Sequence, residues 1–221
     1  NTEAGERLDT FEIPLTNYNL RFNSEGAVLA AGIQGLGSRT LSVRNVETGE
    51  ALRTFESPVG AVYRGMWLQD GTTVASRLLD VPTVIFWDAE TGERRQAIEL
   101  EGYTGEVTRV AFGPDGTILA LGLGNGTVPL WNLTTGEIQQ TLQGYAEDIL
   151  RVAFSPDGTK LATGELNVGD STVTLWETET GQRLRTLEGI YLAFSPDGER
   201  LATGTESAIA LWDVETGERL H

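Results

Sequence analysis

The chain lacks several residue types that would carry chemistry or cross-linking. It has no cysteine, which excludes disulfides and thiolate metal sites while leaving the compartment open. Its one histidine, His221, is the last residue, so the side chain most often used in acid–base catalysis is missing from the rest of the chain. Hydrophobic content is 39%, and no apolar run approaches the length of a membrane-spanning helix.

Basic residues are also scarce. The chain has 32 Asp and Glu against 16 Lys and Arg, a net charge of −16, and Lys160 is its single lysine. A surface with this average charge repels phosphate backbones and anionic lipids at long range, although a local basic patch can override the average. We therefore expect no nucleic-acid partner and no insertion into a membrane.

An internal repeat dominates what the chain does contain. One column of turn glycines closes sequences that range from NSEG to SPDG, and a second column lies in TGE or TGQ turns. The first column is Gly26, Gly71, Gly116, Gly158 and Gly198, and the second is Gly49, Gly92, Gly136, Gly181 and Gly217. A shared period in the low forties, present five times, predicts a repeat architecture.

Each repeat predicts four short strands. In the fourth copy, ILRVAF (149–154) ends at the turn sequence SPDG, and further β-type runs follow at 160–163, 172–176 and 182–187. Runs of this kind between Gly, Pro and Asp are typical of strands joined by tight turns. One such sheet cannot bury both of its faces, so neighbouring copies must stack on it.

The sequence FSPDG, followed by LATG and VTLWETETG, resembles the WD-repeat β-propeller family, in the style of its bacterial members. The resemblance covers nearly the whole chain. It implies an all-β fold of about five four-stranded antiparallel blades in a single array over residues 1–221. We expect units at about 12–50, 51–100, 101–143, 144–187 and 188–221.

Residues 1–11 align with residues 213–221, so both stretches match the last part of a repeat. Two interpretations stay open. In one, five blades close into a ring and residues 1–11 supply the outer strand of the closing blade. In the other, residues 1–11 end a preceding blade, and the chain is part of a larger ring.

Two positions depart from the repeat. Pro129 lies inside TVPLW, where it removes a ladder donor from an interior strand, so we expect a lost bond or a bulge there. The connection from Gly189 to Phe194 is about half as long as the equivalent connection from Gly144 to Phe154. The first strand of the fifth unit is therefore reached by a shortened loop.

Members of this family often contain a hydrogen-bond network that joins a Gly-His pair, an Asp and the Trp of each blade. Here Gly102-Tyr103 and Gly144-Tyr145 stand where Gly-His is expected, so most of this network is predicted to be missing. Apolar packing must then contribute more to blade stability. The residues expected to supply it are Trp87, Trp131, Trp176, Trp212, Phe112, Phe154 and Phe194.

No residue pattern supports catalysis or metal binding. Ser155 and Ser195 lie in SPDG turns and not in a nucleophile elbow, and the abundant carboxylates fall in repeated solvent turns. An acidic loop at 168–171 offers too few oxygen ligands for calcium. We expect a protein that is not an enzyme, with no cofactor and no metal site.

The remaining functional candidates lie on the surface. In the family, the loops that enter the first strand form one rim of the blades, opposite the SPDG and TGE turns. A column three residues before each Phe or Trp of the first strand reads Asn19, Arg64, Arg109, Arg151 and Tyr191. Because Arg and Tyr dominate binding hot spots, we predict a partner-binding rim formed by Arg64, Arg109, Arg151, Tyr103 and Tyr145. The alternative is that these arginines pair with Glu106, Glu147 or Asp148.

These observations favour a non-catalytic scaffold that binds a protein or peptide at the rim, with an acidic peptide as the natural ligand. One alternative is a sensor or regulatory segment of a larger bacterial signalling protein. Another is a structural assembly subunit, since an open ring would expose sheet faces that self-associate.

Overall fold

A computed structural model describes residues 18–22, 26–33, 40–58, 62–68, 71–78, 83–99, 103, 107–144, 148–165, 171–205 and 207–221. All regular structure in these ranges is β-strand, as the sequence predicted, and no helix there is long and apolar enough to cross a membrane. The chain divides into two compact units, residues 1–103 and residues 104–221.

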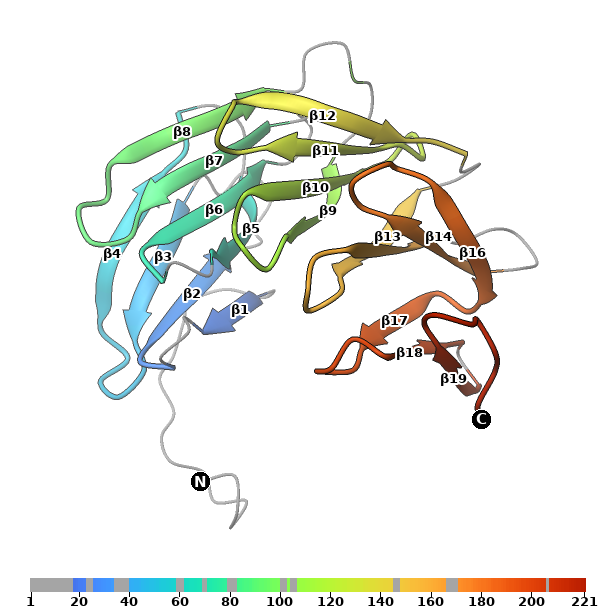
Figure 1. The fold of residues 1–221 in the computed structure, drawn as a ribbon. Coiled ribbons are helices and arrows are strands. Elements are labelled where there is room, and N and C mark those ends of the chain that lie inside the picture. The colour runs from blue at the N-terminus through green and yellow to red at the C-terminus, as the bar shows by residue number, and fades with distance from the viewer. Residues whose placement is uncertain are drawn as a thin grey trace. The chain divides into compact units, whose positions relative to one another are not determined.

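The first unit contains two four-stranded antiparallel sheets in which the strands lie in sequence order (Figure 1). The first sheet is formed by β1 (Tyr18–Phe22), β2 (Val28–Ile33), β3 (Thr40–Asn45) and β4 (Ala51–Glu56). The second is formed by β5 (Val62–Trp67), β6 (Thr73–Leu78), β7 (Thr83–Asp88) and β8 (Arg94–Glu99).

The second unit contains two further four-stranded sheets and one of three strands. The third sheet is formed by β9 (Val107–Phe112), β10 (Ile118–Leu123), β11 (Val128–Asn132) and β12 (Glu137–Leu142). The fourth has β13 (Ile149–Phe154), β14 (Lys160–Glu165), β15 (Thr172–Glu177) and β16 (Arg183–Glu188). The fifth has β17 (Tyr191–Phe194), β18 (Arg200–Gly204) and β19 (Ile209–Asp213), and Arg219 adds a single bridge to Trp212.

The boundary expected between the first two units needs a correction. Residues 51–56 were assigned to the second unit, but β4 pairs with β3, with Thr40 opposite Glu56 and Arg44 opposite Ala51. The TGE turn at Gly49 is therefore a hairpin turn inside the first sheet, and the connection to the next sheet follows residue 56. Residues 1–11, expected to form an outer strand, lie outside the described residues.

The two glycine columns have the backbone conformation that the turn sequences require. All ten glycines have φ between 66° and 82°, in the left-handed region where a side chain is strained. In the fourth sheet, Gly158 N–H donates to Ser155 O and Gly181 N–H donates to Glu177 O, both at 2.9 Å. The turns predicted from the sequence are confirmed.

Successive sheets of the second unit pack face to face. Val128 and Leu130 of the third sheet lie in one buried cluster with Ile149, Leu161 and Trp176 of the fourth. Glycine on the second strand permits this approach, because a Cβ on Gly122 would lie 2.8 Å from Ile149 Cγ2. The third sheet therefore buries its apolar face against the fourth, as the repeat predicts.

The tryptophans are held by hydrogen bonds as well as by packing. The indole Nε1 of Trp176 donates to Thr163 Oγ1 at 2.9 Å, and Trp212 Nε1 donates to Thr203 Oγ1 at 2.7 Å. In the first unit, Trp87 Nε1 donates to Ser76 Oγ at 2.8 Å. The expectation that packing would largely replace the missing network was incomplete, because a hydroxyl on the second strand of the sheet faces the indole.

The third sheet departs from this pattern at Pro129. Pairing between β10 and β11 stops at Ala120 opposite Leu130, one residue before the proline, which confirms the expected loss of a ladder bond. The register shift near Trp131 is not caused by the proline, because β15 and β16 show the same shift at Trp176. The lost bond is thus specific to Pro129, and the shift belongs to the repeat.

The shortened connection predicted for the fifth unit is present as two residues, Gly189 and Ile190, between β16 and β17. Gly189 N–H donates to Ser171 O and Ile190 N–H donates to Gly204 O, both at 2.9 Å. Gly189 has φ of 123°, and a Cβ there would lie 3.0 Å from Thr203 Cβ. The first bond continues the pairing of β15 with β16, and the second continues the pairing of β17 with β18, so the chain passes directly from the fourth sheet into the fifth.

Candidate interaction surface

The predicted column of rim residues occupies equivalent positions in successive sheets. Arg109 on β9 lies opposite Gly122, Arg151 on β13 lies opposite Gly164, and Tyr191 on β17 lies opposite Gly204. We call Arg109, Arg151 and Tyr191 the rim column. The residue opposite each member on the second strand is a glycine, which leaves room beside the column side chain.

Arg109 is half-buried, and its Nη1 donates to the carbonyl of Thr108 at 2.6 Å. The buried hydroxyl of Thr108 lies within hydrogen-bond distance of the carbonyls of Gly122 and Ile149, and so links the third and fourth sheets. The backbone that carries Arg109 is therefore fixed on both sides. Such fixation reduces the conformational entropy that a binding residue loses when a partner docks.

Arg151 lies against the aromatic ring of the next sheet. Its Nη1 donates to Leu150 O at 2.7 Å, and its guanidinium carbon is 4.9 Å from the ring centroid of Tyr191, within the range of a cation–π contact. Asp148, one of the expected ion-pair partners, is exposed, and within the described ranges it forms no ion pair with Arg151. The guanidinium is thus positioned by a backbone carbonyl and a ring.

The other predicted rim residues are placed less completely. Arg64 lies in β5 opposite Arg77, but its side chain is outside the described part of the chain. Tyr103 is half-buried and lies between strands, at the end of the first unit. Tyr145, Glu106 and Glu147 lie outside the described residues. The structure therefore places Arg109 and Arg151 at equivalent positions on neighbouring first strands, and all five rim assignments stay predictions.

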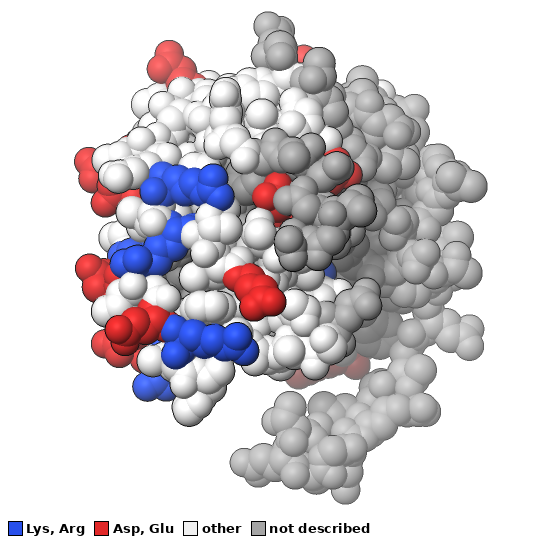
Figure 2. Space-filling view, turned by 90° about the vertical axis from the view of Figure 1, so that its right-hand side faces the viewer, with Lys and Arg blue, Asp and Glu red and all other residues white. Residues whose placement is uncertain are grey.

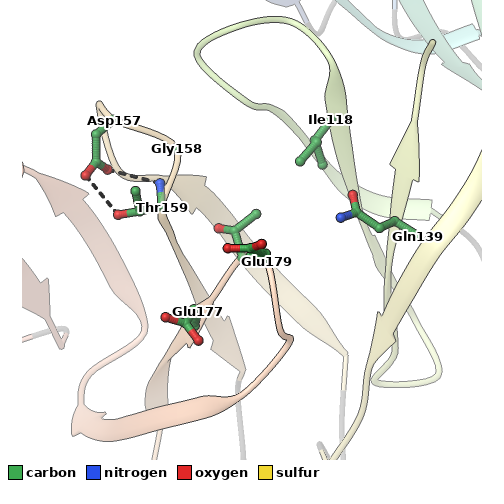
Figure 3. A pocket seen from close by; sticks show the side chains of 8 residues that line it. Ile118, Gln139, Asp157, Gly158, Thr159, Glu177 and Glu179 are labelled. Carbon is green, nitrogen blue, oxygen red and sulfur yellow. Dashed lines mark hydrogen bonds between the residues drawn. The ribbon is translucent and has the colours of Figure 1, made fainter. Parts of the chain in front are cut away.

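The side of the second unit that carries the SPDG and TGE turns, opposite the rim column, contains a pocket of about 350 Å³ between the third and fourth sheets. Ile118 and Gln139 line it from the third sheet, and the turns at 157–159 and 177–179 line it from the fourth (Figure 3). Asp157, Glu177 and Glu179 give it negative charge. This lining would repel an anionic ligand.

The carboxylates of this side are parts of the turns. Asp157 accepts hydrogen bonds from Thr159 N–H at 3.1 Å and from the Thr159 hydroxyl at 2.8 Å (Figure 3). It also accepts one from the Ser155 hydroxyl. The bond from Ser155 is the main cause that lowers the pKa of Asp157, and Ser195 lowers the pKa of Asp197 in the same way. Both carboxyls are therefore ionised at neutral pH and suited to turn formation.

The TGE turns use a second recurring acceptor. Asp88 Oδ1 accepts the backbone N–H groups of Glu90 at 2.9 Å and Thr91 at 2.7 Å. The bond from Thr91, followed by the bond from Arg95, lowers the pKa of Asp88 to about 2. Asn45 and Asn132 accept equivalent bonds in their own sheets, which shows that the position needs an oxygen acceptor and not a charge.

The two serines considered as nucleophiles have structural partners. Ser155 Oγ accepts the backbone N–H of Lys160 at 2.9 Å and donates to Asp157, and Ser195 Oγ accepts the N–H of Arg200 at 3.0 Å. Across the described ranges, no group of three or more His, Asp and Glu residues is arranged to hold a metal ion. The acidic loop considered for calcium lies mostly outside those ranges.

Charges of both signs are mixed on the surface despite the net charge of −16. Figure 2 shows basic and acidic side chains beside one another on the described part of one face. Two ion pairs contribute charges of both signs, the half-buried Lys160 with the exposed Glu215 at 3.9 Å and the exposed Arg219 with Glu188 at 4.0 Å. The acidic average is therefore compatible with a local contact to an acidic partner.

Comparison with known proteins identifies the repeat. Residues 136–177 and 181–213 match the family described as WD domain, G-beta repeat, and residues 87–155 match the anaphase-promoting complex subunit 4 WD40 domain. These stretches contain the SPDG and TGE turns and the Trp residues from which the resemblance was drawn.

Three curated relatives illustrate the similarity. Cell division cycle 20.1, cofactor of APC complex, from Arabidopsis thaliana is 33% identical over 92 residues, which is 41% of this chain and 20% of that protein. Protein HIR1 from Cryptococcus neoformans is 35% identical over 98 residues, or 44% of this chain and 11% of that protein. The serine-threonine kinase receptor-associated protein of Gallus gallus is 26% identical over 130 residues, or 59% and 35%.

The chain thus matches between a tenth and about a third of the length of these relatives. The three relatives come from a plant, a fungus and a bird, so the expected resemblance to bacterial members receives no support from them. The repeat itself, and with it the assignment of the sheets as blades, is supported by the family matches.

Proposed function

Because this chain is a WD-repeat protein, we propose that it is a non-catalytic scaffold that binds a protein or peptide partner through the rim column. The family supports this proposal, since it presents rigid blades and loops without reactive groups. Two relatives carry names that denote association with other proteins, one a cofactor of the APC complex and the other a receptor-associated protein.

The observation that carries the rim assignment is the placement of Arg109 and Arg151. They occupy equivalent positions on β9 and β13, and each is anchored by a hydrogen bond to the carbonyl of the preceding residue. Two positioned guanidinium groups on neighbouring strands favour a partner that presents carboxylates, because arginine pairs with carboxylate through two parallel hydrogen bonds. Arg64, Tyr103 and Tyr145 would extend this surface.

The test uses a fluorescent oligoglutamate peptide and the double variant Arg109→Glu with Arg151→Glu. We expect binding, followed by anisotropy, to weaken about tenfold or more and to lose much of its salt dependence. The matched control is Arg183→Glu with Arg185→Glu, the same charge change on the outer strand β16 of the same unit. Equal loss in both double variants would indicate a general charge effect and would contradict the rim assignment.

Charge reversal at Arg151 also removes its contact with Tyr191. The variants Arg109→Gln and Arg151→Gln separate binding from folding, because each removes the charge and keeps a hydrogen-bond donor. Their urea unfolding midpoints should stay close to the parent value while peptide binding weakens. A parent protein whose peptide affinity is unchanged by all of these substitutions would rule out the rim column as the binding surface.

A second candidate is a regulatory segment within a larger signalling protein. The observation that favours it is the short share of each relative that the chain matches, from 11% to 35% in the three relatives above. The intact mass of the protein purified from its source tests this candidate. A mass of 23.9 kDa would contradict it, and a much larger mass would support it.

A further inference from the structure

The turn between β15 and β16 departs from the repeat at two adjacent positions. Its first residue is Glu177, where the other four turns have Asn or Asp, and its second is Thr178, where the others have an apolar residue. The first position reads Asn45, Asp88, Asn132, Glu177 and Asp213, and the second reads Val46, Ala89, Leu133, Thr178 and Val214. Both departures lie in the wall of the pocket between the third and fourth sheets.

The hydroxyl of Thr178 is buried without a partner. The residue is 4% exposed, and its Oγ1 makes no hydrogen bond in the described part of the chain. Both backbone groups of Thr178 are already bonded, the N–H to Thr159 O at 2.9 Å and the carbonyl to Gln140 Nε2. Because four turns of the repeat form with an apolar residue here, turn formation does not need this hydroxyl. A ligand that bonds it would offset the free-energy cost of burying it.

Two carboxylates in the same wall have acceptor oxygens available. Glu179 is exposed, and its side chain makes no hydrogen bond or ion pair with a residue that the structure describes. Glu177 Oε2 accepts the hydroxyl of Thr180 at 2.6 Å, which leaves Oε1 available. Asp157 differs from both, because hydroxyls of its own turn bond it and the positive charge of Lys160 acts on it. The acceptors open to a ligand are therefore those of the turn between β15 and β16.

The other junctions between sheets of one unit place an arginine where this junction has a glutamine. Arg53 on the outer strand of the first sheet donates to Glu90 O at 2.9 Å, and Arg185 on the outer strand of the fourth donates to Glu215 O at 2.5 Å. Each arginine thus reaches the TGE turn of the next sheet. The strand register gives Gln140 the same place in the third sheet. The turn of the fourth sheet therefore receives no arginine from the third.

We propose that this pocket binds an arginine side chain of a partner protein or peptide. A planar guanidinium has five donors, which suit the carboxylates of Glu177 and Glu179 and the hydroxyl of Thr178. Figure 3 shows Ile118 and Gln139 across the pocket from these carboxylates, so the apolar stem of the arginine would pack on Ile118.

Two further observations fit this occupant. The volume of about 350 Å³ is at the lower end of the range for ligand pockets, as a single side chain requires. The chain itself uses arginine side chains at the equivalent places in two other junctions, and its net charge of −16 attracts a basic partner at long range. The site lies on the side opposite the rim column and does not depend on the function proposed there.

The first experiment titrates the nitrogen-15-labelled full chain with acetyl-Gly-Arg-Gly-amide and follows the amide signals by NMR. We expect saturable shifts at residues 157–159 and 177–179, which line the pocket. The same peptide with citrulline, which keeps the shape and lacks the charge, should bind about tenfold more weakly. The proposal is wrong if the arginine peptide leaves these signals unchanged or if the citrulline peptide binds equally well.

Ethylguanidinium distinguishes a peptide side chain from a free small cation. It carries the same head group without the peptide and most of the stem, so it should bind at least about threefold more weakly. Equal affinity for ethylguanidinium and the arginine peptide would overturn the assignment of a peptide side chain as the occupant.

Variants in the turn separate binding from folding. Glu179→Gln should weaken the arginine peptide about fivefold, whereas Glu90→Gln, at the same turn position in the second sheet, should not change its affinity. Thr178→Val should weaken binding about threefold without lowering the urea unfolding midpoint, since the hydroxyl has no partner in the described structure. A lower midpoint with unchanged affinity would show that the hydroxyl is structural and would contradict its role as a ligand.

Gln140→Arg supplies the arginine from the chain itself, as Arg53 and Arg185 do at the other junctions. We expect it to compete for the turn and to weaken the arginine peptide about tenfold. Gln96→Arg is the matched control, because the register gives Gln96 the equivalent place in the second sheet. A Gln140→Arg variant that binds the peptide as tightly as the parent would contradict the proposal.

Discussion

Thr163 accepts a hydrogen bond from the indole of Trp176 at 2.9 Å, and its hydroxyl also lies 3.3 Å from the carbonyl of Thr174 on the neighbouring strand. Ser76 makes the same two contacts in the second sheet, with Trp87 and Ile85. In the third sheet, Leu121 takes the place of the hydroxyl residue, and Trp131 Nε1 is buried without a partner among the described residues. Each bonded hydroxyl thus ties a tryptophan to the middle of its sheet.

Thr163→Val tests this tie. The substitution keeps the branched shape but leaves the buried Trp176 Nε1 unsatisfied, so we expect unfolding to become easier by about 1–3 kcal/mol in urea titrations. Thr174→Val is the matched control, because the Thr174 hydroxyl is buried and has no partner in the described structure. Equal destabilisation by the two variants would show that the hydrogen bond contributes nothing measurable.

A comparison of tryptophans tests the same point from the other side. Trp176→Phe loses apolar contact and the bond to Thr163, whereas Trp131→Phe loses apolar contact only. We expect Trp176→Phe to destabilise the protein by about 1 kcal/mol more than Trp131→Phe, measured as free energy of unfolding. A larger loss at Trp131 would contradict this ranking.

The short connection makes a prediction about glycine. Gly189 and Gly144 both follow an outer strand and have similar φ, 123° and 118°, but a Cβ would meet three atoms at 3.0–3.1 Å at Gly189 and nothing within 4 Å at Gly144. We expect Gly189→Ala to cost about 1–3 kcal/mol more than Gly144→Ala. The backbone conformations of the two glycines match. Similar unfolding midpoints for the two variants would therefore show that crowding around a Cβ is not the reason why position 189 requires glycine.

Acid should weaken the TGE turn at Asp88. Its pKa is lowered from 3.8 to about 2 in the folded chain, so the ionised carboxylate stabilises the fold above pH 4, and this contribution is lost as the pH falls from about 4 to about 2. Asp88→Asn keeps the acceptor that Asn45 and Asn132 use, and should flatten the fall in stability over this range.

The measurement is urea unfolding at a series of pH values between neutrality and pH 2. Glu90→Gln is the control, because Glu90 is an exposed carboxylate in the same turn. The effect should be modest, since Asp88 lies near solvent and the carboxyls of Asp115, Asp157, Asp197 and Asp213 also have lowered pKa values. A pH profile of Asp88→Asn that coincides with the parent profile would refute a role for this carboxylate.

The features predicted well from the sequence are those that local chemistry dictates. The turn glycines, the strands between them and the broken pairing at Pro129 follow from backbone conformation and from a missing N–H. Equivalent rim positions followed from the repeat spacing, and the register confirmed the equivalence of Arg109 and Arg151.

Features that depend on contacts between strands were missed. Ser and Thr are common in strands, so the sequence alone did not indicate that Ser76, Thr163 and Thr203 bond a tryptophan. The position that they share, close to the end of the second strand of each sheet, is the one sequence feature that could have indicated these bonds. The stacking of Arg151 on Tyr191 was likewise hidden, because it joins two sheets across 40 residues of sequence. The unit boundary at residue 50 failed because a repeated turn marks a hairpin and not the end of a sheet.

The two-residue connection at Gly189 and Ile190 also bears on cooperativity. The fifth sheet has a single bridged residue in place of a fourth strand, so on its own it would fray at a low free-energy cost. Its first strand, however, begins only two residues after β16 ends, with Gly189 bonded to Ser171 in the fourth sheet and Ile190 bonded to Gly204 in the fifth. Opening the fifth sheet must strain the fourth, so amide exchange in β17 and β18 should report the stability of both sheets together.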